Sequence, residues 1–415
     1  MKYGCIGERL GHSFSKEVHS ALNDYEYQLC EVARDDLDSF MVRQDFTAIN
    51  VTIPYKERVI PHLKYIDGHA EAIGAVNTVV NRGDGLYGYN TDFYGLERLL
   101  AHAGVDPKGK KIIILGTGGT SKTAYAVSVA LGATEVIKVS RNPTEGEIGY
   151  DRLYSHHTDA DILINTTPIG MYPDCYCCPV ELSKFHKLSG VIDAVYNPLR
   201  TVLVSEAKMR GIPAEGGLYM LVAQGVRASE IFLDTVYPKG ELDRVFNKIL
   251  SSKENIVLIG MPASGKTSVG GIIAKALGRE FIDTDSLVEN EMGMTIPEIF
   301  ARLGEEAFRD AESRAVRLAS SKTSSVIATG GGAILRPENV AALKQNGRVY
   351  FLDRSTELLI PTSDRPLALD RKAIEERYKE RYPIYTSCAD AVISADGSAC
   401  DVANQIIEKH GVDKI

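Results

Sequence analysis

The chain has 415 residues, of which 44% are hydrophobic and 25% are charged. At roughly 150 residues per domain this length predicts two to three globular domains and argues against a largely disordered chain. Lys and Arg number 47 against 55 Asp and Glu, and the net charge of -8 argues against a nucleic-acid partner. No apolar run approaches the roughly 18 residues that span a bilayer, and the first residues lack a signal-peptide stretch. We therefore expect a cytoplasmic protein without a membrane partner.

Strand-like and helix-like segments alternate from the N-terminus. Strands are predicted over residues 2–6, 27–32, 48–52, 76–81 and 86–89, with an amphipathic helix over 16–23. The last two strands flank Arg82-Gly83-Asp84-Gly85, and this turn sequence predicts a β-hairpin.

The pattern becomes regular from Lys110 onward. Strands are predicted at 112–115, 136–140, 161–165 and 191–194; a helix that ends at Leu131 follows the first of them, and further helices are predicted at 218–234 and near 242–250. Continuous apolar strands of this kind predict a parallel sheet covered by helices on both faces. The polar residues 251–254 are predicted to be a linker, after which strand 256–259 opens a second α/β domain.

A glycine-rich loop follows strand 112–115 and precedes a helix. Its residues Gly116, Gly118 and Gly119 would let the backbone approach a pyrophosphate at the positive end of that helix. Ser121 replaces the third glycine of the usual pattern, so the strand–loop–helix setting carries the prediction. The alternative is a tight turn that binds no ligand.

The end of the next strand indicates which dinucleotide this loop binds. NAD enzymes usually place an acidic residue there, on the ribose hydroxyls. Here the strand ends at Ser140-Arg141-Asn142, and Arg141 can make charge-assisted hydrogen bonds to a 2′-phosphate. The sequence therefore favours NADP(H) as cofactor, and the alternative is a solvated Arg141.

Residues 1–250 resemble shikimate dehydrogenase along nearly their whole length. The matching segments are HSFSK (12–16), NVTIPYK (50–56), GAVNT (74–78), GYNTD (88–92), NTTPIGM (165–171) and GLYMLVAQ (217–224). The resemblance implies NADPH-dependent reduction of 3-dehydroshikimate to shikimate, with Lys56 and Asp92 as the catalytic pair. Its implied substrate partners are Ser13, Ser15, Thr52, Asn77, Tyr196 and Gln224.

The resemblance also implies an organisation for this half. A substrate domain is expected over about 1–100 and 220–250, and a Rossmann-like NADP domain over about 101–219. Gly217 is expected in the cofactor site with the three loop glycines. The family carries a second arginine shortly after Arg141, whereas this chain has Pro143 and Glu145, which predicts a weaker preference for NADP.

The chemistry of ketone reduction suits these residue types. Hydride delivery builds negative charge on the substrate oxygen, which the Lys56 ammonium can stabilise or protonate. Asp92 can orient Lys56 and accept a hydrogen bond from a substrate hydroxyl. Short polar side chains such as Ser13, Ser15, Asn77 and Gln224 suit a polyhydroxylated acid.

A complete P-loop follows strand 256–259. It runs from Gly260 to Gly265, Lys266 and Thr267, and its backbone N–H groups would cradle the phosphates of ATP. Lys266 would reach the β- and γ-phosphates, and the Thr267 hydroxyl would bind Mg²⁺. The loop alone does not identify the phosphate acceptor, because many enzymes share it.

Residues 254–412 resemble shikimate kinase. The matching segments are FIDTD (281–285), AFRDAE (307–312), TGGG (329–332), DRPL (364–367) and ERYPIY (380–385). The roles implied are Asp285 on substrate hydroxyls, Arg309 and Arg381 on the substrate carboxylate, Gly331 in a backbone platform, Asp283 beside the metal and Arg365 in a mobile lid. The segment 353–364 lacks the arginine that the family offers to adenine, which predicts altered ATP binding and lid closure.

These roles agree with the needs of phosphoryl transfer. The reaction depends on positioning and on charge neutralisation, which Lys266, Arg365 and Mg²⁺ would supply. Guanidinium groups bind a carboxylate bidentately, as lysines do not, which suits Arg309 and Arg381.

Together these features predict a bifunctional α/β enzyme in which shikimate, the product of the first half, is the substrate of the second. We expect small-molecule partners only, and the sequence leaves the oligomeric state open. Each half is expected to work alone after a cut within 251–254, with shikimate passing through bulk solvent. One alternative is a first half that uses quinate or shikimate with NAD. Another is a non-catalytic shikimate sensor, which would be expected to lose Lys56, Asp92, Lys266 or Asp283, and all four are present.

Overall fold

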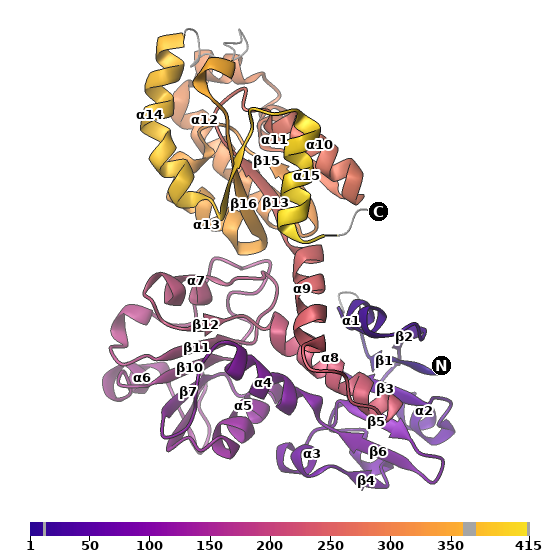
Figure 1. Ribbon diagram of the computed structural model, residues 1–415. Helices are drawn as coiled ribbons and strands as arrows, with labels where there is room; N and C mark the ends of the chain where they lie inside the picture. Colours follow the sequence, from indigo (N-terminus) through magenta and orange to yellow (C-terminus); the bar gives the residue numbers. More distant parts are fainter. Residues whose placement is uncertain (11–13, 360–370, 413–415) are drawn as a thin grey trace. The chain divides into compact units, whose positions relative to one another are not determined.

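The computed structural model describes residues 1–10, 14–359 and 371–412, which form two compact units, Met1–Ile249 and Leu250–Ile415 (Figure 1). Both units are built from mixed α/β layers, and the predicted α/β class with parallel-sheet domains is confirmed. No helix in the described ranges has both the length and the apolar character needed to cross a bilayer.

The first sheet of the N-terminal unit has six strands in the order β2-β1-β3-β5-β6-β4. These strands are β1 (Tyr3–Gly7), β2 (Tyr27–Glu31), β3 (Ala48–Val51), β4 (Tyr65–Ile66), β5 (Thr78–Asn81) and β6 (Leu86–Tyr89). β1 pairs in parallel with β2 and β3, whereas β5 is antiparallel to both β3 and β6. The predicted hairpin is the β5–β6 pair. The two-residue strand β4 was too short to show in the sequence pattern.

The second sheet is entirely parallel and has the order β12-β11-β10-β7-β8-β9. Its strands are β7 (Lys111–Leu115), β8 (Glu135–Val139), β9 (Glu147–Ile148), β10 (Ile162–Asn165), β11 (Gly190–Asp193) and β12 (Ala214–Glu215). In β7, Ile112 and Ile114 enter one hydrophobic cluster and Ile113 and Leu115 enter another. The strand is therefore buried on both faces, as its unbroken apolar sequence predicts.

Helices cover these two sheets. They are α1 (Ser15–Leu22), α2 (Leu37–Arg43), α3 (Gly68–Ile73), α4 (Thr91–His102), α5 (Gly119–Ala130), α6 (Tyr150–His156), α7 (Val202–Met209) and α8 (Leu218–Leu233). α4 and α8 approach closely at Gly95, where a methyl group would lie 2.8 Å from the carbonyl oxygen of Met220. This packing brings the first turn of α4 and the middle of α8 together.

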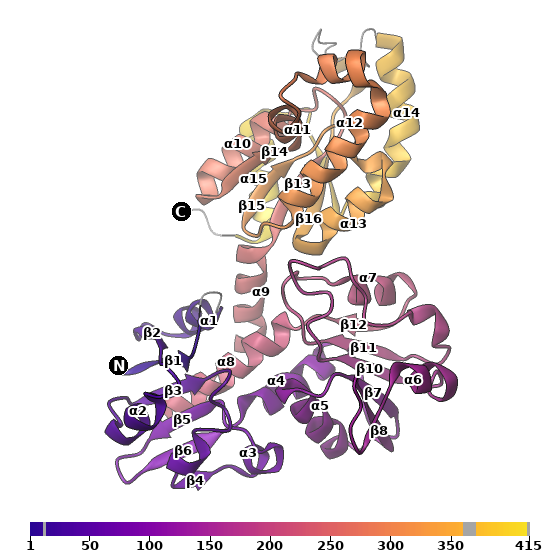
Figure 2. The same ribbon diagram turned by 180° about the vertical axis from the view of Figure 1, so that it is seen from behind.

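The C-terminal unit has one parallel sheet with the order β14-β15-β13-β16-β17. Its elements are β13 (Asn255–Ile259), α10 (Lys266–Leu277), β14 (Glu280–Asp283), α11 (Thr284–Met292), α12 (Ile296–Ser320), β15 (Ser325–Ala328), α13 (Pro337–Asn346), β16 (Gly347–Asp353), α14 (Arg371–Cys388), β17 (Ala391–Ser394) and α15 (Ala399–His410). α12, α13 and α14 cover one face of this sheet, and α10 and α15 cover the other (Figures 1 and 2).

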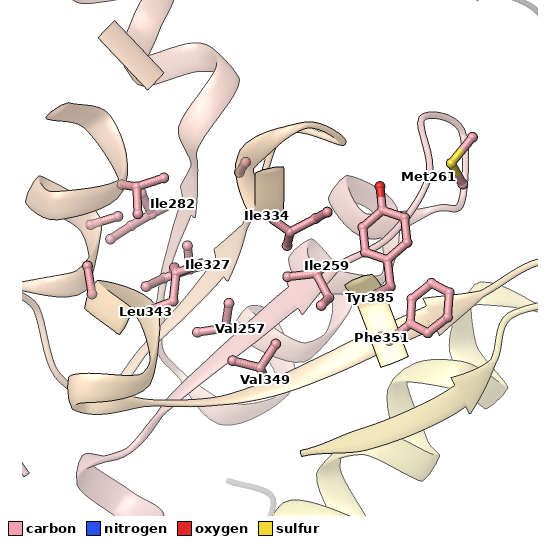
Figure 3. Close-up of a cluster of buried hydrophobic side chains, with 14 of the residues drawn as sticks. Val257, Ile259, Met261, Ile282, Ile327, Ile334, Leu343, Val349, Phe351 and Tyr385 are labelled. Carbon is pink, nitrogen blue, oxygen red and sulfur yellow. The ribbon is translucent and has the colours of Figure 1, made fainter. Parts of the chain in front are cut away.

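Alternate residues of the central strand β13 supply the cores on the two faces. Val257 and Ile259 lie with Phe351 and Tyr385 in the cluster of Figure 3, whereas Ile256 and Leu258 point to the opposite face. Each fully buried aliphatic side chain of this kind contributes about 1.5–3 kcal/mol of apolar burial. The strand is therefore fixed from both sides, and its carboxyl end leads directly into the P-loop.

Residues 251–254, which the sequence predicts to be a linker, are helical up to Lys253. Helix α9 (Glu241–Lys253) continues through Ser251, and β13 begins two residues after the helix ends. The Ser251 carbonyl accepts hydrogen bonds from Arg279 at 2.7 Å and from Nε2 of His410 at 3.1 Å. Local composition suggested a solvated connection, but these polar groups are buried against partners that are distant in the sequence.

Glu254 shows the same burial directly after the helix. Its carboxylate is fully buried and lies 3.0 Å from Nε of Arg348, and its carbonyl accepts a hydrogen bond from Arg279 at 2.9 Å. Residues 251–254 are therefore part of the C-terminal unit's packing. A cut within residues 251–254 would separate Ser251 from β13 and is therefore expected to disturb the packing of the C-terminal unit.

Replacing Arg279 is expected to destabilise the C-terminal unit by about 2 kcal/mol. Arg279→Met keeps the aliphatic stem but removes the guanidinium that donates to the carbonyls of Ser251 and Glu254, and a hydrogen bond lost from a buried group costs roughly 1–3 kcal/mol. Urea unfolding of the full chain, followed by hydrogen exchange at residues 250–260, measures the effect. Lys275→Met, at an exposed position of α10 four residues before Arg279, is the control and should change little. Equal stability of the two variants would contradict this role for Arg279.

Two candidate active sites

The N-terminal unit brings Lys56 and Asp92 into direct contact. Lys56 lies in the loop after β3, and Asp92 lies in the first turn of α4, where the Asn90 side chain caps the helix by accepting from the Asp92 N–H at 3.0 Å. Nζ of Lys56 lies 2.6 Å from Oδ2 of Asp92, with 29% and 18% of the side chains exposed. The carboxylate thus orients an ammonium group that solvent, and so a small molecule, can reach.

A hydrogen-bonded group of uncharged side chains lies next to this pair. Oδ1 of the buried Asn77 accepts from the backbone N–H of Thr91 at 2.8 Å and from the Thr91 hydroxyl at 3.2 Å. The same hydroxyl lies 3.4 Å from Oε1 of Gln224 on α8. Asn77 and Gln224, both predicted to bind substrate, are therefore joined through Thr91, the residue before Asp92. Thr91 was quoted in the GYNTD segment but was given no role.

The structure also describes three further residues that were predicted to bind substrate, namely Ser15, Tyr196 and Thr52. Ser15 begins α1 and interacts with the phenol of Tyr27, whose pKa burial raises well above its ordinary value. The ring of Tyr196, after β11, lies 5.5 Å from that of Phe14, and burial also raises the Tyr196 pKa. Thr52 is half-buried and its N–H donates to the Ile6 carbonyl at 3.0 Å. Ser13 lies outside the described residues.

A buried network of hydrogen bonds connects His19 through Asn50 to the backbone of Asn77. The fully buried ring of His19 lies between the Tyr25 hydroxyl and Oδ1 of Asn50, which is 3.2 Å from Nε2. Nδ2 of Asn50 in turn donates to the Asn77 carbonyl at 3.3 Å. Sequence reasoning missed His19; the only signal was Asn50 in the NVTIPYK segment.

The glycine-rich loop after β7 is open where a phosphate would bind. Methyl groups placed on Gly118 or Gly119 at the start of α5 would meet nothing within 4 Å, whereas one on Gly116 would lie 2.8 Å from Oγ1 of Thr166. The missing side chain of Gly116 therefore allows the tight turn beside Thr166. Gly118 and Gly119 leave the N-terminus of α5 accessible, which suits an anion. Gly217 is different, because a methyl group there would lie 2.2 Å from the Ala194 carbonyl, so its smallness serves backbone packing.

Arg141 lies two residues beyond the end of β8, the neighbour of β7 in the sheet. Its side chain is exposed, and within the described ranges it makes no hydrogen bond or ion pair with another residue. It lies near Tyr150, whose pKa burial raises while the guanidinium opposes that rise. The positive charge is thus available at the carboxyl edge of the sheet that carries the glycine-rich loop.

In the C-terminal unit the P-loop connects β13 to α10. Gly265 caps α10, and Gly260 packs against the Leu352 carbonyl. Nζ of the buried Lys266 donates to the carbonyls of Gly260 at 2.9 Å and Met261 at 2.8 Å, so the ammonium is held within the loop.

Thr267 and Asp283 come together as a pair of oxygen groups. The Thr267 hydroxyl donates to Oδ2 of Asp283 at 2.9 Å, while Oδ1 accepts from the N–H of Asp285 at 3.0 Å and caps α11. Hydroxyl and carboxylate oxygens are the ligands that Mg²⁺ prefers. Within the described ranges no group of three or more His, Cys, Asp or Glu side chains is arranged around a metal position. The donor set therefore fits a Mg²⁺ ion that takes its other ligands from a bound nucleotide and water.

The P-loop opens into a cavity of about 750 Å³. Asp285, Arg309, Gly331 and Arg381 all line it, so the predicted acceptor residues meet at one place. The platform there is closely packed, because a methyl group on Gly331 would lie 2.7 Å from Cδ of Pro262. Nη1 of Arg381 donates to the Gly331 carbonyl at 3.0 Å. Arg365 lies outside the described residues.

Glu312 is a residue of this cavity for which the sequence suggested no role. Its carboxylate is almost fully buried and accepts from Nη1 of Arg309 at 2.7 Å, and Arg309 also contacts Glu305 at 3.1 Å. Burial raises the pKa of Glu312, while Arg309 opposes the rise. Glu312 therefore fixes the direction of the Arg309 side chain. It was quoted in the AFRDAE segment, three residues after Arg309, a spacing that places both on one helix face.

Two family models match the chain. The model for the shikimate dehydrogenase substrate binding domain matches residues 5–79, and the model for shikimate kinase matches residues 262–410. A shikimate dehydrogenase (NADP(+)) of Clostridium perfringens is 35% identical over 265 residues, which cover 60% of this chain and 97% of that protein.

Solved structures agree with this over the N-terminal unit. Shikimate dehydrogenase 1 of Peptoclostridium difficile has a TM-score of 0.54 and 34% identity, and the match covers 60% of this chain and 97% of that one. A Thermus thermophilus shikimate 5-dehydrogenase in complex with NADP(H) and shikimate has a TM-score of 0.53 and 26% identity, over 59% of this chain and 98% of that one.

Acid pH is expected to destabilise both units. Burial lowers the pKa of His19 and of His410 from 6.5 to about 3, so below pH 6.5 the unfolded chain binds protons that the folded chain does not. The stability present above that pH is then lost as the pH falls toward 3, by at most about 1.4 kcal/mol per pH unit for each histidine.

Urea unfolding between about pH 7.5 and pH 5, read separately through the activity of each unit, measures this loss. His19→Gln should flatten the pH dependence of the N-terminal unit alone. An unchanged slope in that variant would show that His19 is not the titrating group.

Proposed function

Because this chain belongs to the shikimate dehydrogenase family and carries a shikimate kinase domain after it, we propose that it catalyses two consecutive reactions. The first is reduction of 3-dehydroshikimate to shikimate with NADPH, and the second is phosphorylation of shikimate to shikimate 3-phosphate with ATP and Mg²⁺. The observation that carries this proposal is that one chain holds both the Lys56–Asp92 contact and a P-loop cavity lined by Asp285, Arg309 and Arg381.

In the reduction, Lys56 and Asp92 handle the proton. Negative charge develops on the ketone oxygen as hydride arrives, and the Lys56 ammonium stabilises and protonates it. Asp92, 2.6 Å away, holds that ammonium in place and is free to accept from a substrate hydroxyl with its other oxygen. Asn77 and Gln224 supply polar contacts for the hydroxylated ring.

The cofactor assignment depends on Arg141 and the open helix N-terminus of α5. The loop at Gly118 and Gly119 leaves room for a pyrophosphate, and the Arg141 guanidinium, which has no partner within the described ranges, suits a 2′-phosphate. The Clostridium perfringens relative is named for NADP(+), and the Thermus structure contains NADP(H), which supports NADP(H) here. When bound, the cofactor supplies the hydride; the chain's own residues orient the substrate and move the proton.

In the phosphorylation, positive charge and positioning do most of the work. Lys266 and the α10 N-terminus neutralise the phosphates of ATP, while Thr267 and Asp283 hold Mg²⁺. Asp285 is placed to contact the acceptor hydroxyls, with Arg309 and Arg381 for the acceptor's carboxylate. We keep Arg365 as a proposed lid residue from the sequence alone.

Alternatives remain for the first half. A shikimate 5-dehydrogenase of Listeria monocytogenes, 27% identical with a TM-score of 0.52, was solved in complex with shikimate and NAD. NAD use, or action on quinate, is therefore the second candidate. A non-catalytic sensor is less favoured, because such a protein would be expected to lose Lys56, Asp92, Lys266 or Asp283, and all four are present at the two sites. We propose a cytoplasmic enzyme with small-molecule partners and without nucleic-acid or membrane partners.

One coupled assay tests the proposal. The full chain receives 3-dehydroshikimate, NADPH and MgATP, and shikimate 3-phosphate is measured together with NADPH consumption. We expect one NADPH and one ATP consumed per shikimate 3-phosphate formed. Failure to consume NADPH, or accumulation of shikimate with ATP present, would refute the corresponding half.

Lys56→Ala is expected to lower dehydrogenase turnover by about 10²-fold or more, the scale of a positioned proton donor, with kinase activity unchanged. Lys64→Ala is the matched control, since Lys64 is an exposed lysine of the same unit that pairs with Asp84. Turnover of the Lys56 variant near that of the control would remove Lys56 from the mechanism.

Arg141→Ala is expected to raise the KM for NADPH about tenfold and to leave the KM for NADH nearly unchanged, because only NADPH carries the 2′-phosphate. Arg152→Ala, at an exposed position on α6, is the control. Equal losses with both cofactors would mean that Arg141 has a structural role only.

A further inference from the structure

Arg354 is the first residue after β16, at a place where the sheet brings it next to the P-loop. β16 pairs in parallel with β13 over the whole length of β13, from Asn255 with Gly347 to Ile259 with Phe351. The carboxyl ends of adjacent parallel strands lie at the same edge of a sheet. The residue that follows β16 therefore lies beside the loop that follows β13.

The side-chain contacts confirm this placement. Arg354 lines the same 750 Å³ cavity as Gly265, Lys266 and Thr267. A methyl group placed on Gly265, the cap of α10, would lie 3.7 Å from Nη1 of Arg354. The guanidinium thus lies in contact distance of the helix N-terminus at which the phosphates of a nucleotide bind.

Arg354 makes no hydrogen bond or ion pair with another residue within the described ranges. Its Nε is buried and has no hydrogen-bond partner among the described residues. The nearby carboxylate of Asp396 accepts instead from the N–H of Ser355 at 2.8 Å and from the Ser355 hydroxyl. A buried guanidinium N–H without a partner costs free energy, so its retention in a cavity needs a reason.

The neighbouring arginines of the cavity have other partners. Arg309 is held by Glu312 and Glu305, and Arg381 donates to the Gly331 carbonyl on the acceptor side. Arg354 is distinct, because its donors face the P-loop.

We propose that Arg354 binds the phosphate chain of the nucleotide, acting together with Lys266 and the N-terminus of α10. This inference rests on the proposed kinase function for its physiological ligand. ATP carries several negative charges in a short chain, and a guanidinium offers planar, bidentate hydrogen bonds to phosphate oxygens that an ammonium does not. Arg354 would thereby add a second cation at the point where the dipole of α10 already favours an anion.

Calorimetric binding to the full chain tests the proposal, with MgADP, magnesium tripolyphosphate and shikimate as separate titrants. Arg354→Ala should weaken MgADP and magnesium tripolyphosphate about tenfold or more, and Arg354→Lys should recover only part of the loss. Shikimate affinity and dehydrogenase turnover should stay at the wild-type values. Arg302→Ala removes an exposed arginine of α12 in the same unit and is the matched control.

Three outcomes of the variant comparison overturn the proposal. MgADP affinity within twofold of the control would show that Arg354 does not contact the nucleotide. A loss for MgADP but not for magnesium tripolyphosphate would place the contact on the adenosine. Equal losses for MgADP and shikimate would indicate a folding defect. If the wild-type chain binds MgADP without phosphorylating shikimate, the proposed function fails while the Arg354 comparison still stands.

Discussion

The burial of parallel strands on both faces is the constraint on which both units depend. β7 and β13 each send alternate residues into two separate hydrophobic clusters, so neither strand has a face left for polar chemistry. Helices must cover both faces, and each crossover returns the chain to the same edge. Functional groups can then gather only where strands end. Arg141, Thr267, Asp283 and Arg354 all follow this rule, since Asp283 is the last residue of β14 and the other three lie in segments that follow a strand.

Structural features that depend on residues close together in the sequence could be predicted without a structure. The two glycine-rich loops, the hairpin and the apolar strands depend on neighbouring residues, and the structure has them where the sequence indicates. The Lys56–Asp92 contact was expected because the resemblance assigned both residues a role at one site, and the Thr267–Asp283 contact because the P-loop motif and the resemblance each placed one of the two at the metal. Edge strands β4, β9 and β12 were missed, since two residues carry no periodicity.

Polar groups that are buried against distant partners could not be predicted in this way. Composition identifies residues 251–254 as solvated, yet Arg279, Arg348 and His410 surround them from positions far along the chain. His19 and Glu312 were missed for the same reason, because a titratable side chain in a helix usually faces solvent. The unused Nε of Arg354 is likewise visible only once β16 is paired with β13. The sequence therefore indicated the side chains that we propose to contact ligands more readily than the buried side chains that orient them.

The charge balance of the acceptor cavity follows from these buried pairs. Glu312 and Glu305 already compensate Arg309, and Asp285 adds a further negative charge nearby. A carboxylate substrate entering on Arg309 alone would meet a site without net positive charge, and burying an unpaired anion is costly. Arg381 changes that balance, because it donates to the neutral Gly331 carbonyl and forms no ion pair within the described part of the chain. If the acceptor is a carboxylate, as we propose, Arg309 would supply direction because Glu312 fixes it, and Arg381 would supply the positive charge that makes binding favourable.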